Sequence, residues 1–288
     1  MEDSQAYKVV VITGASQGIG LTLAQQLAAS NHHQAEQQPK YKLVLAARSR
    51  EALEEAANAL NEQVADKSFA PVAVAVQADV SKREDHKRLL QSAIDAFGRV
   101  DVWVNNAGRG ITKPVLELTD EDFDDMMLVN CKSVLYGMQT VVPYFKQQGR
   151  GHLINVSSVL GRLPFASIRS AYSAAKHAVN SLTCTMRMDL LREGFQDIHV
   201  TLFSPGAVAT DFGLNALHGG PDNRQLPGAQ PVEEVAEALV DAIRRPRADV
   251  YSREAYRTAV AAYYSAERVE EIEAKHAASP VPILSTAK

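Results

Sequence analysis

The chain has 288 residues, of which 46% are hydrophobic and 22% are charged, so it has the composition of a folded protein with a large core. Lysine and arginine total 30 against 34 aspartates and glutamates, which gives a net charge of -4 at pH 7. A protein that binds a phosphate backbone normally carries a basic excess, so we expect no nucleic-acid partner.

Two cysteines, Cys131 and Cys184, are too few for a disulfide framework or a four-ligand zinc site. The first residues lack the basic start and apolar core of a signal peptide. No apolar run approaches the roughly 20 residues needed to cross a bilayer. We therefore expect a cytoplasmic protein without a membrane span.

Short β-branched runs alternate with helical segments along most of the chain. The runs are continuously apolar, as in strands buried on both faces, and cover residues 8–13, 42–46, 72–77, 100–105, 152–157 and 199–203. Helical periodicity marks residues 19–29, 50–63, 83–97 and 172–192. This order predicts one α/β domain, residues 1–288, with a Rossmann-like doubly wound parallel sheet and helices on both faces.

Several segments look appended to a core at residues 8–250. The polar stretch 31–40 predicts a surface loop before the second strand. Residues 219–231 are rich in Gly, Pro, Asn and Gln and predict a mobile loop, as part of a substrate loop at 211–231. A C-terminal helical extension at 253–277 and a flexible tail at 278–288 complete the prediction.

The first strand runs directly into a glycine-rich turn, Thr13-Gly14-Ala15-Ser16-Gln17-Gly18-Ile19-Gly20, and a helix follows. Such a turn lets backbone N–H groups and the helix N-terminus face a pyrophosphate. A Cβ at the glycines would block the turn, the ligand or the packing of helix on strand. The spacing differs from the Gly-x-Gly-x-x-Gly fingerprint, so the turn alone leaves a purely structural role open.

Further motifs follow in a fixed order: Asn105-Asn106-Ala107-Gly108, Asn130, Ser158, Tyr172-x3-Lys176 and Pro205-Gly206. With the glycine turn, this ordered set resembles the short-chain dehydrogenase/reductase family over residues 8–250, in the branch with Thr-Gly-x3-Gly-x-Gly and Tyr-x3-Lys motifs. The resemblance implies that these residues form a dinucleotide-binding catalytic core. It also implies a homodimer or homotetramer.

The resemblance assigns cofactor contacts along the whole core. They comprise Gly14, Ser16, Gln17, Gly18, Ile19 and Gly20 in the turn, then Asp79, Val80, Asn106, Ala107, Gly108, Tyr172, Lys176, Pro205, Gly206, Val208 and Thr210. Asp79 and Val80 would meet the adenine edge, unless Asp79 caps a helix that starts near Ser81. The Val208 backbone and Thr210 hydroxyl would hold the nicotinamide amide, unless this segment is a plain turn.

The end of the second strand bears on which dinucleotide binds. NAD-binding relatives carry an acid there that bonds the ribose hydroxyls, whereas this chain has Ala47. Arg48 follows and offers a planar charged group that suits a 2′-phosphate, to which Ser49 and Arg50 could add. Gln17 departs from the many NADP-binding relatives that have a basic residue at its place. These residues favour NADP(H), with NAD(H) possible.

Tyr172 and Lys176 lie four residues apart in a helical segment and therefore share a helix face. An ordinary phenol has a pKa of about 10 and is a poor base at neutral pH. A nearby ammonium and an oxidised nicotinamide would favour the phenolate and lower the pKa of Tyr172. The resemblance implies that Tyr172 is the acid/base and that Lys176 also bonds the cofactor ribose.

Ser158 and Asn130 complete the catalytic set that the resemblance implies. The Ser158 hydroxyl would stabilise charge on the substrate oxygen. Asn130 would kink a helix and hold a water that links Lys176 to solvent. The separation of fourteen between Ser158 and Tyr172 is one longer than most relatives show, which we place in the loop at 165–169. Ser157 is the fallback for Ser158.

Other polar residues are given structural roles, and no metal site is expected. The acidic run at 119–125 indicates a helix capped by Thr119 or Asp120. His32 and His33 lack partners at ligand spacing, and His177 should face away from the catalytic side. His218 could touch substrate. An apolar helical face near the C-terminus should pack on the domain or a second subunit; it comprises Tyr256, Val260, Tyr263, Tyr264, Val269 and Ile272.

These features predict NADPH-dependent reduction of a ketone or aldehyde, reversibly the oxidation of a secondary alcohol, by direct hydride transfer. An apolar pocket lining indicates a hydrophobic substrate; it draws on Leu160, Leu163, Phe165, Phe212, Leu214 and Leu217. Two alternatives remain: an NAD-dependent alcohol dehydrogenase, and an NADP(H)-binding sensor without turnover.

Overall fold

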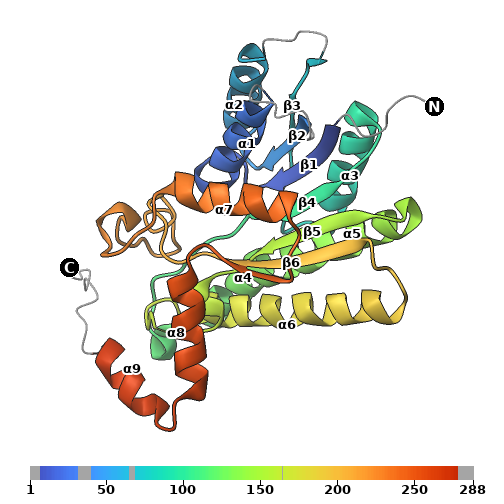
Figure 1. Ribbon diagram of the computed structural model, residues 1–288. Coiled ribbons are helices and arrows are strands. Elements are labelled where there is room, and N and C mark those ends of the chain that lie inside the picture. Colours follow the sequence, from blue (N-terminus) through green and yellow to red (C-terminus); the bar gives the residue numbers. More distant parts are fainter. Residues whose placement is uncertain (1–6, 32–39, 65–68, 164, 278–288) are drawn as a thin grey trace.

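The computed structural model describes residues 7–31, 40–64, 69–163 and 165–277, and these ranges form a three-layered α/β domain (Figure 1). The sheet in the described part of the chain has seven parallel strands in the order β3-β2-β1-β4-β5-β6-β7. They are β1 Tyr7–Thr13, β2 Lys40–Ala47, β3 Ala73–Gln77, β4 Val102–Asn105, β5 Gly151–Val156, β6 Ile198–Ser204 and β7 Asp249–Tyr251.

The predicted doubly wound fold is confirmed, and each of the six predicted strands is present within one or two residues of its expected bounds. The sequence analysis missed β7. Its three residues, Asp249–Tyr251, are too few to give a strand pattern, and they pair with β6 only through the tertiary fold.

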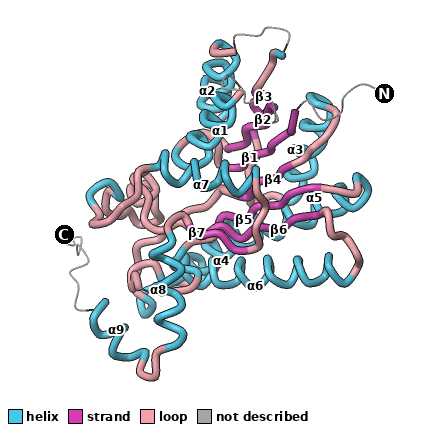
Figure 2. Tube along the Cα trace, in the orientation of Figure 1, coloured by secondary structure: helices cyan, strands magenta, loops and turns pink. Residues whose placement is uncertain are grey.

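Helices cover both faces of the sheet (Figure 2). They are α1 Gly18–Ser30, α2 Arg50–Glu62, α3 Arg83–Phe97, α4 Asp120–Met127, α5 Ser133–Gln148, α6 Ser170–Arg192, α7 Val232–Arg244, α8 Glu254–Ser265 and α9 Val269–Ala277. Val10 and Ile12 of the central strand pack with α1, α2 and α7, whereas Val9 and Val11 pack with α3, α5 and α6. All four side chains are fully buried, as expected for a strand covered on both faces.

The segments predicted as loops are tied to the core more firmly than their composition indicates. Asn31 holds the backbone of Tyr41 through bonds of 2.8 and 3.1 Å, so the two ends of the polar insertion meet. Lys40 already belongs to β2, and residues 32–39 lie outside the described part. In the loop predicted to be mobile, the Gln230 backbone N–H donates to Ala207 O at 2.8 Å and Asn223 is buried.

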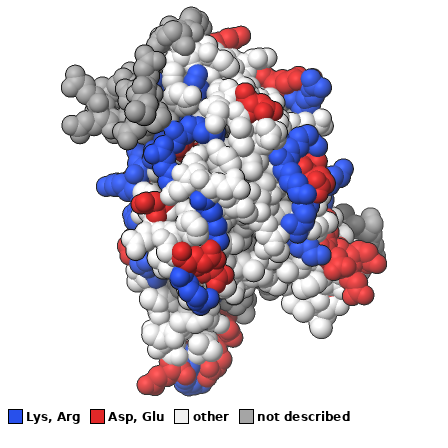
Figure 3. All heavy atoms as spheres, turned by 90° about the vertical axis from the view of Figure 1, so that its right-hand side faces the viewer, with Lys and Arg blue, Asp and Glu red and all other residues white. Residues whose placement is uncertain are grey.

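The C-terminal extension is two helices rather than one helical stretch. Figure 1 shows α8 running beside the end of the sheet and α9 turning away from it, and the predicted tail at 278–288 lies outside the described residues. None of the helices in the described ranges combines the length and apolar character needed to span a membrane. On the face shown in Figure 3, basic side chains lie beside acidic ones rather than in a single positive field.

We expect the buried layer between the sheet and α1, α2 and α7 to dominate stability. Leu45→Ala should lower the free energy of unfolding by about 2–5 kcal/mol, because Leu45 is fully buried and its loss leaves a cavity. Leu116→Ala is the matched control, since Leu116 is 99% exposed and should change stability by no more than about 0.5 kcal/mol. Urea unfolding measures both; equal losses would contradict the assignment of the core.

Candidate active site

The glycine turn is fixed to the neighbouring strand end by one side chain, Thr13. Its hydroxyl donates to Val104 O at 3.2 Å and accepts from the backbone N–H groups of Asn106 and Ala107 at 3.0 and 3.1 Å. β1 lies between β2 and β4, and the chain builds outward to β2 and β3 on one side before it returns to β4 on the other. Ligands of open α/β sheets bind where the strand order reverses in this way.

At two positions in the turn, any residue with a Cβ would clash with the neighbouring backbone. Gly14 has a φ of +68°, and a Cβ there would stand 2.9 Å from the Ala107 Cα. A Cβ at Gly20 would stand 2.5 Å from the carbonyl oxygen of Gly14. The turn, the start of α1 and the end of β4 can therefore approach one another only without these side chains.

The start of α1 fits a phosphate group. Gln17 is the N-cap residue in an extended conformation and makes no side-chain cap bond, and the first turn of α1 contains no acid. The first backbone N–H groups of a helix lack intrahelical acceptors and carry partial positive charge. This arrangement can accept the pyrophosphate of a dinucleotide.

A pocket of about 380 Å³ lies where β2 and β3 end. It is lined by Arg48, Gln77, Ala78, Asp79, Lys82, Asp85 and Arg88. Arg48 is exposed there, as the phosphate-pocket prediction requires. Ser49 instead caps α2 by accepting from Ala52 N at 3.4 Å, and Arg50 pairs with Glu54 at 2.7 Å.

Lys82 and Arg88 are pocket residues that the sequence analysis did not identify. Arg88 pairs with Asp85 at 2.8 Å and donates to the Gln77 carbonyl at 3.0 Å. Both belong to the polar start of α3, and polar residues are common in the first turns of surface helices. Only the fold brings them opposite Arg48.

Asp79 does not cap a helix that starts near Ser81, because α3 begins at Arg83 with Lys82 as its N-cap residue. The Asp79 carboxylate instead accepts from the backbone and hydroxyl of Ser81 at 3.0 and 2.7 Å. It therefore shapes the loop at the rim of the Arg48 pocket, where an adenine edge would be met.

Asn130 lies in a π-helical segment, Leu128–Lys132, between α4 and α5. Its amide accepts from Arg109 N at 3.0 Å and donates to the carbonyls of Arg109 and Met126 at 2.9 and 3.1 Å. A π-helical turn lies where the sequence analysis expects a kink, and it holds the loop after β4 through these bonds. A Cβ at Gly108 would stand 3.0 Å from Asn130 Oδ1 and 3.7 Å from Lys176 Nζ, so the two polar groups border the same small space.

Tyr172 and Lys176 share one face of α6 and are both buried. Burial lowers the pKa of Lys176 to about 8, and its Nζ donates to the Val156 carbonyl at 2.8 Å. The pKa of Tyr172 is raised to about 12, which is opposite to the direction expected from the sequence, because burial outweighs a hydrogen bond with Ser158 and the positive charge of Arg169. Lys176 Nζ lies 5.6 Å from the centre of the Tyr172 ring.

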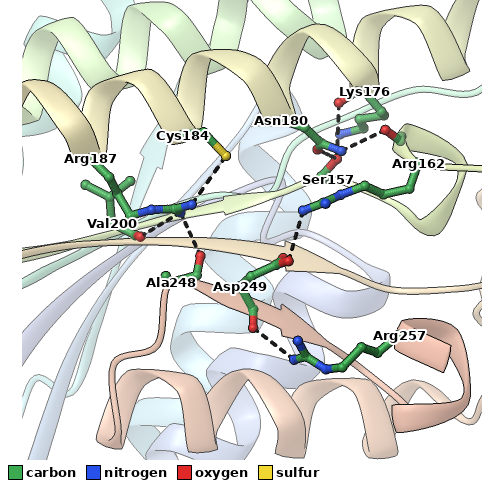
Figure 4. Close-up of polar contacts among 11 residues, drawn as sticks. Ser157, Arg162, Lys176, Asn180, Cys184, Arg187, Val200, Ala248, Asp249 and Arg257 are labelled. Atoms are coloured by element: carbon green, nitrogen blue, oxygen red, sulfur yellow. Dashed lines mark hydrogen bonds and ion pairs between the residues drawn. The ribbon is translucent and has the colours of Figure 1, made fainter. Parts of the chain in front are cut away.

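Ser158 rather than Ser157 reaches Tyr172. Its hydroxyl accepts from Leu160 N at 3.1 Å and lies within hydrogen-bonding reach of the phenol. Ser157 is 2% exposed, and its hydroxyl bonds the Asn180 side chain at 2.5 Å and the Lys176 carbonyl at 3.3 Å (Figure 4). The fallback residue is thus engaged in fastening α6 to β5.

The segment after β6 closes the site opposite the glycine turn. Val208 pairs with Gln230 and its carbonyl accepts from Asn223 Nδ2 at 3.2 Å, so the loop at 219–231 holds it in place. A Cβ at Gly18 would stand 3.4 Å from Thr210 Cγ2, which places Thr210 beside the turn. Gly206 is covered by Tyr256 of α8, because a Cβ there would stand 2.2 Å from the Tyr256 hydroxyl.

Tyr172 belongs to an apolar cluster. It comprises Ile111, Met126, Ala171 and Tyr172, with Leu118, Leu160, Phe212 and Leu217 packed against it. Of the other residues expected in the pocket lining, Leu163 is buried and Leu214 is 49% exposed. Phe165 packs on Tyr263 and His276 of the C-terminal helices instead.

His218 contacts an acid. It has a φ of +65°, and its Nε2 lies 2.6 Å from Asp122 Oδ1, while Lys113 Nζ lies 2.7 Å from Asp122 Oδ2. Thr119 caps α4, as predicted, in a capping box with Asp122. The described residues contain no group of three or more His, Cys, Asp or Glu that could hold a metal. His177 bonds the Ser173 carbonyl at 2.8 Å, and His32 and His33 lie outside the described ranges.

The sequence is similar to those of known dehydrogenases. A profile of the short chain dehydrogenase family matches residues 8–218. An uncharacterized oxidoreductase of Bacillus subtilis is 37% identical over 248 residues, which are 85% of this chain and 65% of the Bacillus protein. An uncharacterized oxidoreductase of Staphylococcus epidermidis is 33% identical, with coverage of 83% of this chain and 92% of that protein.

Solved structures of short-chain dehydrogenases are also similar to this chain. A short chain dehydrogenase/reductase of Burkholderia phymatum in complex with NAD superposes with a TM-score of 0.77 at 28% identity, covering 95% of this chain and 97% of that one. An alcohol dehydrogenase of the archaeon Thermococcus sibiricus complexed with 5-hydroxy-NADP gives 0.70 at 30% identity, with coverage of 87% and 97%. Both kinds of nicotinamide dinucleotide therefore bind to relatives with this fold.

The contacts of Asp122 predict that the free energy of unfolding decreases at acid pH. Lys113 and His218 hold the pKa of this carboxyl well below its ordinary value of 3.8 in the folded chain. Its contribution is therefore present above pH 3.8 and is lost as the pH falls below that value. Asp122→Asn should lower the free energy of unfolding at neutral pH and flatten its acid dependence, as measured by urea unfolding across the acid range.

The exposed Asp124 on the same helix provides the matched control. Asp124→Asn should leave both the stability at neutral pH and its acid dependence close to those of the unaltered chain. An acid dependence that is the same in Asp122→Asn and the unaltered chain would show that this carboxylate does not couple to folding.

Proposed function

Since this chain belongs to the short-chain dehydrogenase/reductase family of oxidoreductases, we propose that it reduces a ketone or aldehyde with NADPH and, in reverse, oxidises a secondary alcohol. The observation that carries the proposal is the buried pair of Tyr172 and Lys176 with Ser158 beside the phenol. A protein that only bound a dinucleotide would have no use for an acid/base at this place.

The glycine turn, with Ser16, Gln17 and Ile19 beside its glycines, would hold the pyrophosphate at the start of α1. Asn106, Ala107 and Gly108 would lie along the dinucleotide at the end of β4, and Asp79 and Val80 at its adenine edge. Bound NADPH would supply a hydride, two electrons and one proton, to the carbonyl carbon.

Tyr172 would supply the remaining proton. As hydride arrives at carbon, the O–H of Tyr172 breaks and its proton passes to the carbonyl oxygen, which leaves a phenolate and an alcohol. Burial keeps the free phenol protonated by raising its pKa to about 12. The positive charges of Lys176 and of the oxidised nicotinamide would lower this pKa during the reaction and so favour release of the proton. In the reverse direction the phenolate takes the proton from the alcohol.

The other polar residues would stabilise the negative charges that develop on the substrate oxygen and on the phenolate. Ser158 donates a hydrogen bond to the substrate oxygen as negative charge develops there. Lys176, one turn along α6, stabilises the phenolate by its positive charge and bonds the ribose hydroxyls. Asn130 would hold a water that returns a proton from solvent through Lys176.

Positive charge at the end of β2 favours NADPH over NADH. Ala47 leaves no acid to bond a ribose hydroxyl, and Arg48 lines a pocket that also contains Lys82 and Arg88. Asp85 in this pocket is already paired with Arg88. A 2′-phosphate would therefore meet an excess of positive charge, with the Arg48 guanidinium as its main partner.

An NAD-dependent alcohol dehydrogenase is the second candidate, because the Burkholderia phymatum relative was solved with NAD. A third is an NADP(H)-binding sensor without turnover. For the substrate we propose a hydrophobic carbonyl compound, since Leu160, Phe212 and Leu217 pack around Tyr172. A cytoplasmic location belongs to the same proposal, as does the homodimer or homotetramer that the family resemblance implies.

Cofactor choice is tested by fluorescence titration with NADPH and NADH. The unaltered chain should bind NADPH more tightly, and Arg48→Asp should weaken NADPH binding by about 10- to 100-fold, because a charged hydrogen bond to phosphate is lost. Arg50→Asp is the control, since Arg50 is paired with Glu54. A preference for NADH in the unaltered chain would favour the NAD-dependent alternative.

Catalysis is tested by Tyr172→Phe. This change should lower carbonyl reduction by at least about 100-fold, because the proton donor is removed, while NADPH affinity changes little. The measurements are NADPH oxidation in the presence of hydrophobic ketones and titration of the cofactor. Tight NADPH binding without turnover of any carbonyl or alcohol by the unaltered chain would favour the sensor alternative.

A further inference from the structure

A buried arginine lies beside the proposed acid/base. The proposed hydride and proton transfers do not use it. Arg169 is the residue before α6, three positions before Tyr172, and is only 7% exposed. The guanidinium and the phenol influence each other's pKa through their charges, which places them in one electrostatic environment. The sequence analysis passed over this residue because nothing in its local pattern distinguishes it from a surface arginine.

The positive charge of Arg169 is not balanced by a carboxylate among the described residues. Its one side-chain hydrogen bond there joins Nη1 to the Ile111 carbonyl at 2.9 Å, although a guanidinium has five N–H donors. The buried carboxylate Asp122 is bonded by Lys113 and by His218 instead. Burial lowers the pKa of the guanidinium, and an uncompensated buried charge is costly unless an anion joins it.

Two glycines pack closely against the Arg169 guanidinium. A Cβ at Gly110 would stand 2.8 Å from Arg169 Nη1 and 3.0 Å from the Phe212 ring. A Cβ at Gly220 would stand 3.2 Å from Arg169 Nη2 and 2.9 Å from the hydroxyl of Thr112. The two polar groups therefore border the same point between the loop after β4 and the loop after β6.

The Thr112 hydroxyl is, after the Arg169 guanidinium, the second polar group that indicates a ligand site here. It is buried and has no hydrogen-bond partner within the described ranges. A buried hydroxyl without a partner is unfavourable by about 1–3 kcal/mol, so such groups are normally satisfied. A guanidinium fork and a hydroxyl together offer donors to a group that has two acceptor oxygens and one negative charge.

We propose that Arg169, assisted by Thr112, binds a carboxylate on the substrate, so that the carbonyl compound is an oxo acid. This inference rests on the proposed reductase function and names its substrate class. One buried positive charge matches one carboxylate, and the planar guanidinium can bond both of its oxygens. The apolar side chains of Leu160, Phe212 and Leu217 would then pack along the hydrocarbon part.

The spacing limits the distance between the two functional groups of the substrate. Arg169 directly precedes α6, three positions before Tyr172, and the charges of the two side chains affect each other. With the carbonyl at Tyr172 and the carboxylate at Arg169, a short spacer is required between them. A simple 2-oxo acid, in which the two groups are adjacent, would fit this separation less well.

The test compares straight-chain oxo acids, with one to three methylene groups between carbonyl and carboxylate, with their methyl esters. The unaltered chain with NADPH should show a kcat/KM about 10- to 100-fold higher for the best acid than for its ester, the effect of one charged hydrogen-bonded contact. Arg169→Gln should raise KM for the acid and abolish this preference, so that acid and ester are used with similar kcat/KM. Equal use of acid and ester by the unaltered chain would overturn the proposal.

Two further variants separate binding from loss of structure or of net charge. Arg169→Lys keeps the charge and should retain part of the preference for acids. Arg192→Gln removes a charge at the exposed far end of the same helix and should behave like the unaltered chain. A preference for acids that survives in Arg169→Gln, or is lost equally in Arg192→Gln, would contradict a role for Arg169.

A binding measurement distinguishes failure of this inference from failure of the proposed function. Pentanoate, which cannot be reduced, should raise the melting temperature of the unaltered chain with NADPH but not that of Arg169→Gln. If no carbonyl is reduced but pentanoate still stabilises the protein through Arg169, the anion site stands and the reductase function does not. The absence of any stabilisation would rule out the anion site.

Discussion

Parallel strands end at a common edge, and this constraint brings together every residue of the candidate site. Thr13 at the end of β1 bonds the backbone at the end of β4, and Lys176 bonds the last residue of β5. The segment after β6 lies against the same edge, next to Gly18. Residues almost 200 positions apart in the chain thus form one cleft because the sheet has a single direction.

Burial at this edge determines the electrostatics of the site. Tyr172, Lys176 and Arg169 are all shielded from water, and burial moves each pKa in the direction that disfavours charge. A site with buried positive charges favours ligands that carry negative charge and so balance them. The positive end of α1, the Arg48 pocket and Arg169 each favour an anionic group. In our proposals these groups are a pyrophosphate, a 2′-phosphate and a substrate carboxylate.

The C-terminal extension is joined to this cleft by polar contacts as well as by packing. Arg162, in the loop after β5, pairs with Asp249 of β7 at 3.0 Å, and Arg257 of α8 donates to the Asp249 carbonyl at 3.2 Å (Figure 4). Tyr256 covers Gly206, and Tyr264 donates to the Arg162 carbonyl at 2.9 Å. The extension therefore supports two segments that border the active site, the loop that follows Ser158 and the turn at Gly206.

The sequence by itself determined the α/β class, six strands and the family, because strand burial and helix periodicity are local patterns and the motifs stand in a fixed order. It also singled out Arg48, Asn130, Ser158, Tyr172 and Lys176. The tertiary structure alone decided that Ser158 and not Ser157 meets Tyr172, that Asp79 shapes a loop, and that β7 exists. It alone placed Lys82, Arg88 and Arg169 at the cleft. Those outcomes depend on contacts between segments distant in the chain, which a local pattern does not encode.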